Sequence, residues 1–264
     1  SEIDQSLTQL GKYISMMPVM DAKHGKILIY SILFGCADIG VLIASVLSVS
    51  DMPFIGGFEN RDKIKRIVMK HGKEDGDLLA VIKLVFEYLN IPMNSARRNF
   101  LHENLLSYNK MNEIASSNSQ FYSILKDTGF LPFNYKCGDK WFNRNGDNMK
   151  IVRSILTGAF YPNLARVQLP DPKFAMTSAG AVEKDPDAKK IRYWIRNEEY
   201  IEKVDDLLQG KLEPNKDISN GKKNGKNGND LSVLPATKAF IHPASVFFDT
   251  SGNSSGSVEE LSGY

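Results

Sequence analysis

Apolar positions at helical spacing dominate the first 160 residues of the chain. A repeat of three and four residues predicts helices with one buried face. The segments that carry it are Glu59–Lys70, Asp77–Asn90, Ser107–Thr128 and Asp147–Phe160. In this region we expect the core to include Leu28, Leu33, Phe34, Phe86, Phe121 and Leu125. The pattern therefore predicts an α-helical bundle.

The stretch from Ile27 to Val49 carries one charged residue, Asp38, and is as long as a membrane span. A carboxylate at the centre of a bilayer would cost about 2.5–3.5 kcal/mol. Two nearby glycines also weaken a continuous helix. We favour a buried hairpin, with Asp38 as the N-cap of its second helix, over a hairpin inserted in a membrane. Its predicted helices are Lys26–Cys36 and Ile39–Val49.

The pattern changes near residue 161, where short runs of β-branched and aromatic residues begin. These runs predict four strands, at Ala165–Leu169, Ile191–Arg196, Lys238–His242 and Ser245–Asp249. Helices followed by strands indicate an α+β chain with a second, β-rich domain. Trp141 and Trp194 could each stack on a nucleic-acid base, but the apolar strand around Trp194 favours its burial.

Two polar stretches interrupt the β-rich part. Residues 198–209 are acidic and helical in pattern, and residues 220–229 are a run of Asn, Gly and Lys that we expect to be disordered. A protein partner could bind through 198–230. This leaves open a second interpretation of the chain, as a stand-alone α-helical protein-interaction scaffold.

Composition and motifs limit the chemistry. The net charge of +2 gives no global attraction for nucleic acid, so binding must come from local patches. Cys36 and Cys137 form neither a metal motif nor a disulfide framework, which favours a reducing compartment. No phosphate-binding loop and no hydrolase or metalloprotease motif occurs. We expect no catalysis, no metal and no cofactor in this chain itself.

Seven motifs, taken in order, resemble the C-terminal region of DEAH/RHA-type ATP-dependent RNA helicases. The chain starts at Ser1 rather than Met, so we expect it to be part of a longer protein. The motifs are Leu7–Val19, Gly25–Leu28 together with Phe34–Asp38, Glu74–Ala80, Phe100–Ser107, Gln120–Leu125, Ile155–Ala165 and Phe240–Val246. In the motif Glu74–Ala80, the His of the family is either replaced by Gly76 or displaced.

The resemblance implies a domain order. Residues 1–20 would end a degenerate winged-helix domain, 21–160 would form the helical helicase-associated (ratchet) domain, and 161–264 would form a partial OB-fold β-barrel with a long insertion near 170–237. It also implies a role. The chain would be an accessory module that holds single-stranded RNA against two RecA-like motor domains outside it, and those domains would use ATP and Mg.

Candidate RNA contacts come from the motifs at the β-rich end. Arg166 and Lys238 are expected to contact phosphates, while Asn163, His242 and Ser245 would donate hydrogen bonds. The alternative is structural, with Asn163 at a helix stop and His242 at a strand end. Arg97 and Arg98 could line the RNA path, although a solvated helix face is favoured for both. The same holds for the basic helix Arg61–Lys73. We expect a cytoplasmic protein without a membrane segment, the nucleus being the alternative.

Overall fold

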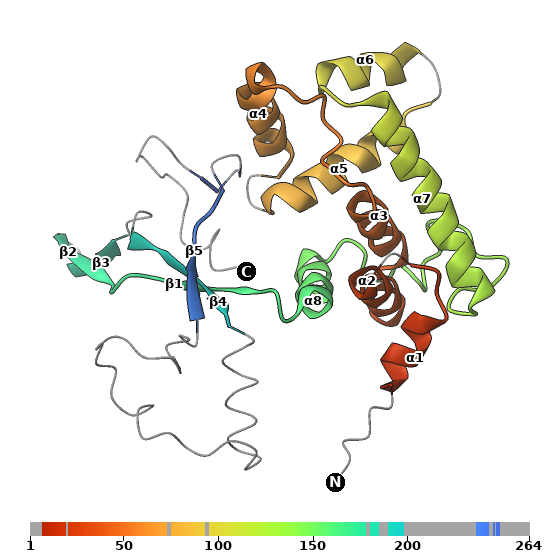
Figure 1. Cartoon of the computed structure of the whole chain (residues 1–264). Coiled ribbons are helices and arrows are strands. Elements are labelled where there is room, and N and C mark those ends of the chain that lie inside the picture. Colours follow the sequence, from red (N-terminus) through yellow and green to blue (C-terminus); the bar gives the residue numbers. More distant parts are fainter. Residues whose placement is uncertain are drawn as a thin grey trace, which may run out of the picture. The chain divides into compact units, whose positions relative to one another are not determined.

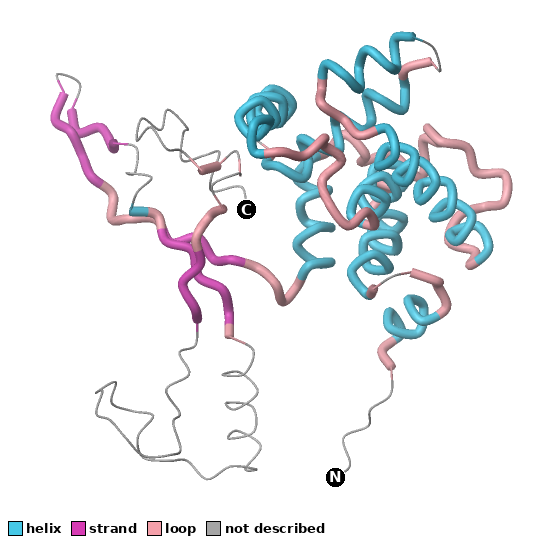
Figure 2. The backbone as a smooth tube through the Cα atoms, turned by 45° about the horizontal axis from the view of Figure 1, so that its top comes forward, coloured by secondary structure: helices cyan, strands magenta, loops and turns pink. Residues whose placement is uncertain are grey.

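The computed structural model describes residues 7–19, 21–72, 75–92, 95–177, 180–184, 190–197, 236–242, 245 and 247–248. The chain divides into two compact units. The helical unit comprises Ser1–Tyr161 and Ile241–Thr250, and the β unit comprises Pro162–Phe240 and Ser251–Tyr264. Figure 2 shows helices in the first and strands in the second. The structure is therefore of the α+β class, as predicted.

The helical unit contains eight α-helices and one short 3-10 helix within the described residues. They are α1 (Gln9–Ser15), α2 (Ala22–Leu33), α3 (Ala37–Leu47), η1 (Phe58–Asn60), α4 (Arg61–Gly72), α5 (Gly76–Asn90), α6 (Ser95–Glu103), α7 (Tyr108–Asp127) and α8 (Met149–Phe160). All the predicted helices are present, with ends shifted by a few residues. Helix α6 was not predicted, because its polar sequence buries only Leu101.

Helices α2 and α3 form the predicted apolar hairpin. Helix α2 also packs against α8, and α3 packs against α7 (Figure 1). Within the described ranges, no helix is long and apolar enough to cross a membrane. Three residues expected in the core are instead exposed: Leu33, Phe34 and Phe86. Leu33 and Phe34 lie at the end of α2 away from its buried face, whereas Leu28, Phe121 and Leu125 are buried as predicted.

Asp38 is not the N-cap of α3; Cys36 occupies that position without a side-chain cap. Asp38 lies in the first turn instead, where its carboxylate accepts hydrogen bonds from the hydroxyls of Tyr122 at 2.7 Å and Tyr135 at 2.6 Å. It also accepts one from the backbone N–H of Gly138 at 2.6 Å. Burial is the largest cause that raises the pKa of both tyrosines above the ordinary range, and the hydrogen bonds to Asp38 raise it further. One carboxylate thus ties α3 to α7 and to the loop before α8.

The β unit holds a three-stranded antiparallel sheet in the order β1-β4-β5. Its strands are β1 (Ala165–Gln168), β4 (Arg192–Arg196) and β5 (Ala236–Ala239), and a separate antiparallel hairpin is formed by β2 (Lys173–Thr177) and β3 (Gly180–Lys184). Strands β1 and β4 match predicted strands, β5 overlaps one in part, and the hairpin lies in the stretch interpreted as an insertion. The described strands do not close into a barrel, so the structure supports a β-rich unit and leaves the partial OB-fold a proposal.

The fourth predicted strand, Ser245–Asp249, is wrong at its described residues. Ser245 lies in a bend and Phe247 in a turn. The segment belongs to the helical unit, where Lys65 Nζ donates a 2.5 Å hydrogen bond to the carbonyl of Phe248. Local β propensity is overridden here by contacts with α4 and α5. The predicted strand Lys238–His242 is displaced, because β5 runs from Ala236 to Ala239 and overlaps the prediction only at Lys238 and Ala239.

The acidic stretch 198–209 and the Asn/Gly/Lys run 220–229 lie outside the described residues.

Candidate nucleic-acid interface

A row of two cations and one aromatic ring crosses the three-stranded sheet of the β unit. Arg166 of β1 lies directly opposite Trp194 of β4, and Trp194 lies directly opposite Lys238 of β5. Directly paired residues of antiparallel strands project their side chains from the same face, with Cβ atoms about 4.5–5.5 Å apart. Two of the predicted RNA-contacting residues are therefore brought together on either side of an indole ring.

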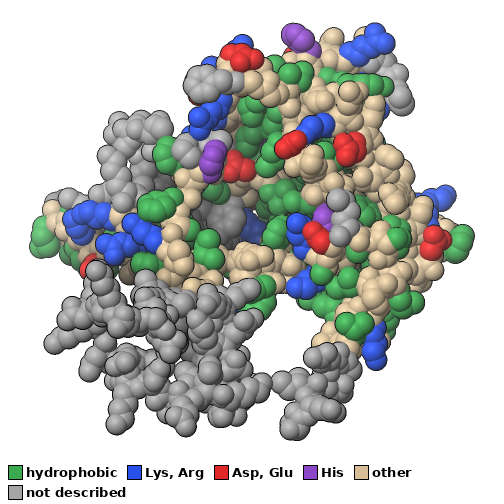
Figure 3. Space-filling view, in the orientation of Figure 1, with side chains coloured by type: hydrophobic (Ala, Val, Ile, Leu, Met, Phe, Trp, Pro, Cys, Tyr) green, Lys and Arg blue, Asp and Glu red, His purple; other side chains and the backbone are tan. Residues whose placement is uncertain are grey.

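The same face carries two further arginines. Arg192 and Arg196 lie two residues before and after Trp194 on β4, so the alternation of a strand places them on the Trp194 side. Arg192 is paired with Gln168 of β1. Figure 3 shows Lys and Arg side chains gathered over the strands of this unit. We call Arg166, Arg192, Arg196 and Lys238 the basic face.

Trp194 is held in place on the basic face by a hydrogen bond. Its indole N–H donates to Oε1 of Gln168 at 2.7 Å. The side chain is half-buried rather than buried, which corrects the burial favoured by the apolar sequence around it. The error arose because the run of Arg-Tyr-Trp-Ile-Arg alternates, and Trp194 falls on the arginine side. That period of two is the signal that could also have identified Arg192 and Arg196.

The other face of the sheet is apolar. Val167, Tyr193 and Ile195 project from it, and Val167 is paired with Tyr193. Burial raises the pKa of the Tyr193 hydroxyl. The two faces differ in chemistry rather than in exposure, because Ile195 is 43% exposed and Val167 and Tyr193 are half-buried, as Trp194 is.

A second aromatic ring stands beside Lys238. Phe240, just beyond β5, is 79% exposed, and Lys238 Nζ lies 4.8 Å from the centre of its ring. A cation over an aromatic face is attracted by the ring quadrupole. Lys238 therefore has an aromatic neighbour along its own chain and another, Trp194, across the sheet.

Asn163 is exposed in the β unit, between the end of α8 and the start of β1. It precedes Arg166 by three residues. The structure therefore places Asn163, Arg166 and Lys238 in the β unit, whereas the other four predicted contacts lie in the helical unit.

Ser245 and His242 lie beside α5 in the helical unit. The Ser245 hydroxyl donates a 2.6 Å hydrogen bond to Oδ2 of Asp77, and its oxygen accepts the backbone N–H of Phe247 at 3.3 Å. His242 is exposed, and its carbonyl accepts the backbone N–H of Ser245 at 2.9 Å. The hydroxyl of Ser245 thus serves the attachment of this segment to α5.

A groove of about 770 Å³ runs beside the same segment. Its lining combines apolar side chains with three cations and two acids. The lining residues are Asp51, Met52, Phe54, Gly56, Gly57, Arg61, Ile64, Lys65, Val68, Asp77, Val81, Lys110, His242 and Ser245. Lys110 is paired with Asp51 at 3.0 Å, and Lys65 donates to the backbone of Phe248. Two of the three cations that line the groove, Lys65 and Lys110, therefore already make contacts within the protein.

Arg97 has a structural position at the end of α5. Its guanidinium donates hydrogen bonds of 3.1 Å to the carbonyls of Leu89 and Ile91, and it lies 4.8 Å from the ring centre of Tyr88. These contacts satisfy carbonyls that a helix end leaves unpaired. Arg98, its neighbour on α6, is exposed.

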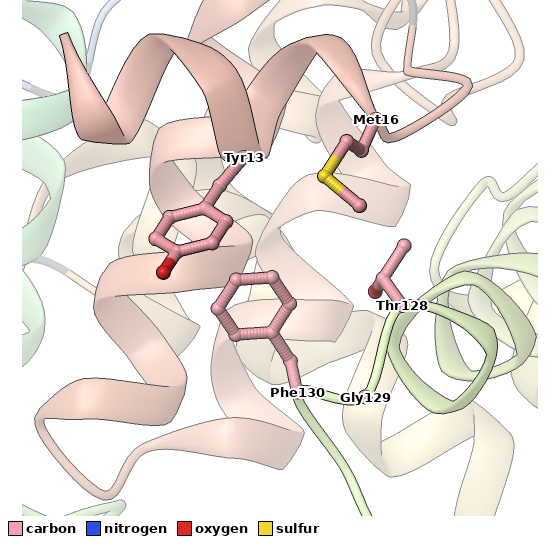
Figure 4. A pocket seen from close by; sticks show the side chains of 5 residues that line it. All are labelled: Tyr13, Met16, Thr128, Gly129 and Phe130. Atoms are coloured by element: carbon pink, nitrogen blue, oxygen red, sulfur yellow. The ribbon is translucent and has the colours of Figure 1, made fainter.

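A smaller pocket of about 230 Å³ lies between the ends of α1 and α7, lined by Tyr13, Met16, Thr128, Gly129 and Phe130 (Figure 4). No charged side chain lines it, and the Thr128 hydroxyl is bonded to the carbonyl of Ile124 at 2.6 Å. Tyr13 and Phe130 pack edge to face at 5.4 Å between ring centres. The pocket is a packing feature of the helical unit. Across the described part of the chain, no cluster of His, Cys, Asp and Glu could hold a metal ion.

Comparison with known proteins adds independent evidence. The helicase associated domain (HA2), ratchet-like, matches residues 21–81, from α2 into α5. The chain is 57% identical over 252 residues to the putative ATP-dependent RNA helicase YLR419W of Saccharomyces cerevisiae, covering 94% of this chain and 17% of that protein. It is 28% identical over 201 residues to the putative ATP-dependent RNA helicase DHX57 of Homo sapiens, covering 69% of this chain and 14% of that protein.

A third relative, the ATP-dependent DNA/RNA helicase DHX36 of Bos taurus, is 28% identical over 170 residues, which cover 62% of this chain and 16% of that protein. The chain thus spans less than a fifth of the length of these relatives.

The helical bundle with its β-rich companion, together with these matches, places the chain among the DEAH-type ATP-dependent RNA helicases. More particularly, it is a segment that carries the ratchet-like helicase-associated domain of such a protein. The resemblance drawn from the sequence motifs is confirmed.

Proposed function

We propose that this chain is an accessory RNA-binding module of an ATP-dependent RNA helicase, and that it holds single-stranded RNA next to motor domains carried elsewhere in the same protein. The homology supports the assignment to a helicase, because the curated relatives named above are ATP-dependent helicases. ATP and Mg would then be bound by the motor domains. In this proposal residues 21–160 form the ratchet domain and 161–264 a partial OB-fold.

One observation carries the RNA-binding part of the proposal: four cationic side chains share one face of the β1-β4-β5 sheet. Phosphate oxygens are the complementary partners of such a face, and each neutralised phosphate releases counterions. The net charge of the whole chain is only +2, so the positive charge is a local feature of the sheet rather than a general property. A strand of RNA laid across the sheet would meet a cation on every strand.

Among the predicted contacts, Arg166, Lys238 and Asn163 fit this proposal best, because all three are exposed in the β unit. His242 and Arg98 are exposed in the helical unit and remain candidate contacts there. Ser245 and Arg97 already serve internal hydrogen bonds, so we propose that their main contribution is to the fold.

Binding of labelled single-stranded RNA by the 264-residue chain, followed by fluorescence anisotropy over a range of salt concentrations, tests the proposal. Four phosphate contacts predict that log K falls against log salt with a slope of roughly −3, since each contact on a single strand contributes about −0.7. An affinity that does not change with salt would contradict it and would favour the protein-interaction scaffold.

We further propose a cytoplasmic location, with the nucleus as the alternative. It rests on Cys36, which is buried, and Cys137, which is exposed; both are free thiols.

A further inference from the structure

The centre of the basic face is an aromatic ring, which phosphate binding alone does not require. Trp194 stands between Arg166 and Lys238 in one cross-strand row. It is a half-buried side chain on the polar side of the sheet. The exposed part of this indole is a flat apolar surface that lies between two cations. Its place among the cations calls for a ligand with both a flat apolar face and negative charge.

We infer that Trp194 is a platform on which an unpaired base of RNA stacks, while the phosphates on either side of that nucleotide contact Arg166 and Lys238. The inference rests on the proposed function and names the side chain that recognises bases within it. Stacking on an aromatic ring contributes about 1–3 kcal/mol per base by alanine substitution, and it accepts every base because each has a π face. The site is therefore expected to bind RNA without sequence preference.

The hydrogen bond from Trp194 to Gln168 pre-orients the platform. Because the indole N–H is held at 2.7 Å by Oε1 of Gln168, the ring does not have to be ordered when RNA binds. Fixing a side chain in advance lowers the entropic cost of binding. Gln168 is thus a positioning residue for the platform.

Phe240 supplies a second ring next to the first. It is 79% exposed and lies under the ammonium group of Lys238. One lysine flanked by two rings matches the alternation of bases and phosphates along a strand. We infer that a second base stacks on Phe240.

The geometry also selects single strands over duplexes. In an A-form duplex the base faces are covered by their neighbours in the stack, so a side chain on a sheet can reach only the edges and the backbone. Phosphate contacts alone would accept either form. A platform that uses base faces accepts only unpaired nucleotides.

The chain has two tryptophans, Trp141 and Trp194, which makes a direct test possible. Trp141 lies in the helical unit, so the Trp141→Phe variant leaves Trp194 as the single indole reporter. Emission is measured while a uridine-rich 12-mer is added, either as a single strand or within a blunt RNA duplex. We expect the single strand to quench Trp194 in step with binding, and the duplex to leave its emission unchanged.

Substitutions in the same background separate stacking from charge. Trp194→Ala is expected to lower affinity for the single strand roughly tenfold with an unchanged salt slope. Trp194→Phe keeps a ring and should retain most of the affinity, which also guards against a folding defect in the alanine variant. Arg166→Gln should reduce the salt slope but leave quenching at saturation intact. Phe240→Ala should lower affinity without changing the emission of the free protein.

Salt-dependent binding without a change in Trp194 emission would overturn the platform while leaving the proposed function in place. Equal quenching by the duplex, or unchanged affinity in Trp194→Ala, would overturn it too. Absence of any RNA binding would overturn both.

Discussion

Gly40 of α3 lies directly against Ser31 of α2. A Cβ atom at position 40 would lie 1.8 Å from Oγ and 2.1 Å from Cβ of Ser31. Ser31 is buried, and its hydroxyl donates a 2.6 Å hydrogen bond to the carbonyl of Ile27. The two helices of the apolar hairpin are therefore in contact through a glycine that leaves room for a serine. Gly40 is one of the two glycines that argue against a continuous helix in the sequence, and its lack of a side chain permits this packing.

Gly40→Ala should destabilise the helical unit by about 3 kcal/mol or more, because a methyl group has no space at the crossing and the helices must separate. The double variant Gly40→Ala with Ser31→Gly removes both clashing atoms and should return to within about 1–2 kcal/mol of the original stability. Urea unfolding measures both. Additive losses in the double variant would show that the crossing is not the cause.

A matched control for this pair is Gly11→Ala in α1. The nearest atom to the added Cβ is Thr8 Oγ1 at 3.4 Å, an ordinary contact. We expect no loss of stability, and a gain of up to about 1 kcal/mol from the higher helix propensity of alanine.

Tyr135→Phe should cost about 1–3 kcal/mol, because it removes one of the three donors that satisfy the Asp38 carboxylate. Asp38→Asn should cost as much or more, since both tyrosine hydroxyls then lose a charged acceptor. Tyr108→Phe is the control, because Tyr108 is 61% exposed and should be insensitive. If Tyr135→Phe and Tyr108→Phe had the same melting temperature, the hydrogen bond from Tyr135 to Asp38 would not stabilise the fold.

Asp75 makes the stability of the helical unit depend on pH. Its carboxylate pairs with Lys83 and, at 2.6 Å, with Nη2 of Arg153 on α8. Burial acts to raise its pKa, but hydrogen bonds from Lys83 and Arg153 outweigh that effect and hold the pKa below the ordinary value of 3.8. Because the folded-state pKa is lowered, the stabilisation is present above pH 3.8 and is lost as pH falls through the folded value.

The expected result is a loss of stability on acidification below pH 3.8 that is smaller in Asp75→Asn, and a cost of about 1–3 kcal/mol for that variant at neutral pH. Urea unfolding between neutral pH and pH 3 compares the two proteins. If the free energy of unfolding fell equally with pH in both proteins, Asp75 would not be the cause of the pH dependence.

The helical part of the fold was predictable because its apolar spacing is strong. The predicted helix Asp77–Asn90 is observed as Gly76–Asn90, and Asp147–Phe160 as Met149–Phe160. Helix α6 escaped prediction because a charged sequence with one buried residue has no clear apolar stripe. The predicted strand at 245–249 failed because Phe248 and Ser245 make hydrogen bonds to Lys65 of α4 and Asp77 of α5.

The candidate site was predictable only in part. Arg166 and Lys238 were identified from family motifs that lie far apart in the sequence, and nothing in the sequence alone showed that both pair with Trp194. Strand register decides which side chains share a face, and a shift of one residue would place Trp194 on the apolar side. Phe240 lay inside a motif, but its exposure follows from the end of β5 at Ala239.

The central claim, that the basic face binds RNA, is tested most directly by the salt dependence of single-stranded RNA binding in charge-neutralised variants of the full chain. Arg166→Gln and Lys238→Gln should each weaken binding and make the slope of log K against log salt shallower by about 0.7, and the double variant by about 1.4. Lys136→Gln, which removes an exposed cation from the helical unit, is the matched control and should leave both quantities unchanged. Slopes that are the same in all four proteins would contradict the account.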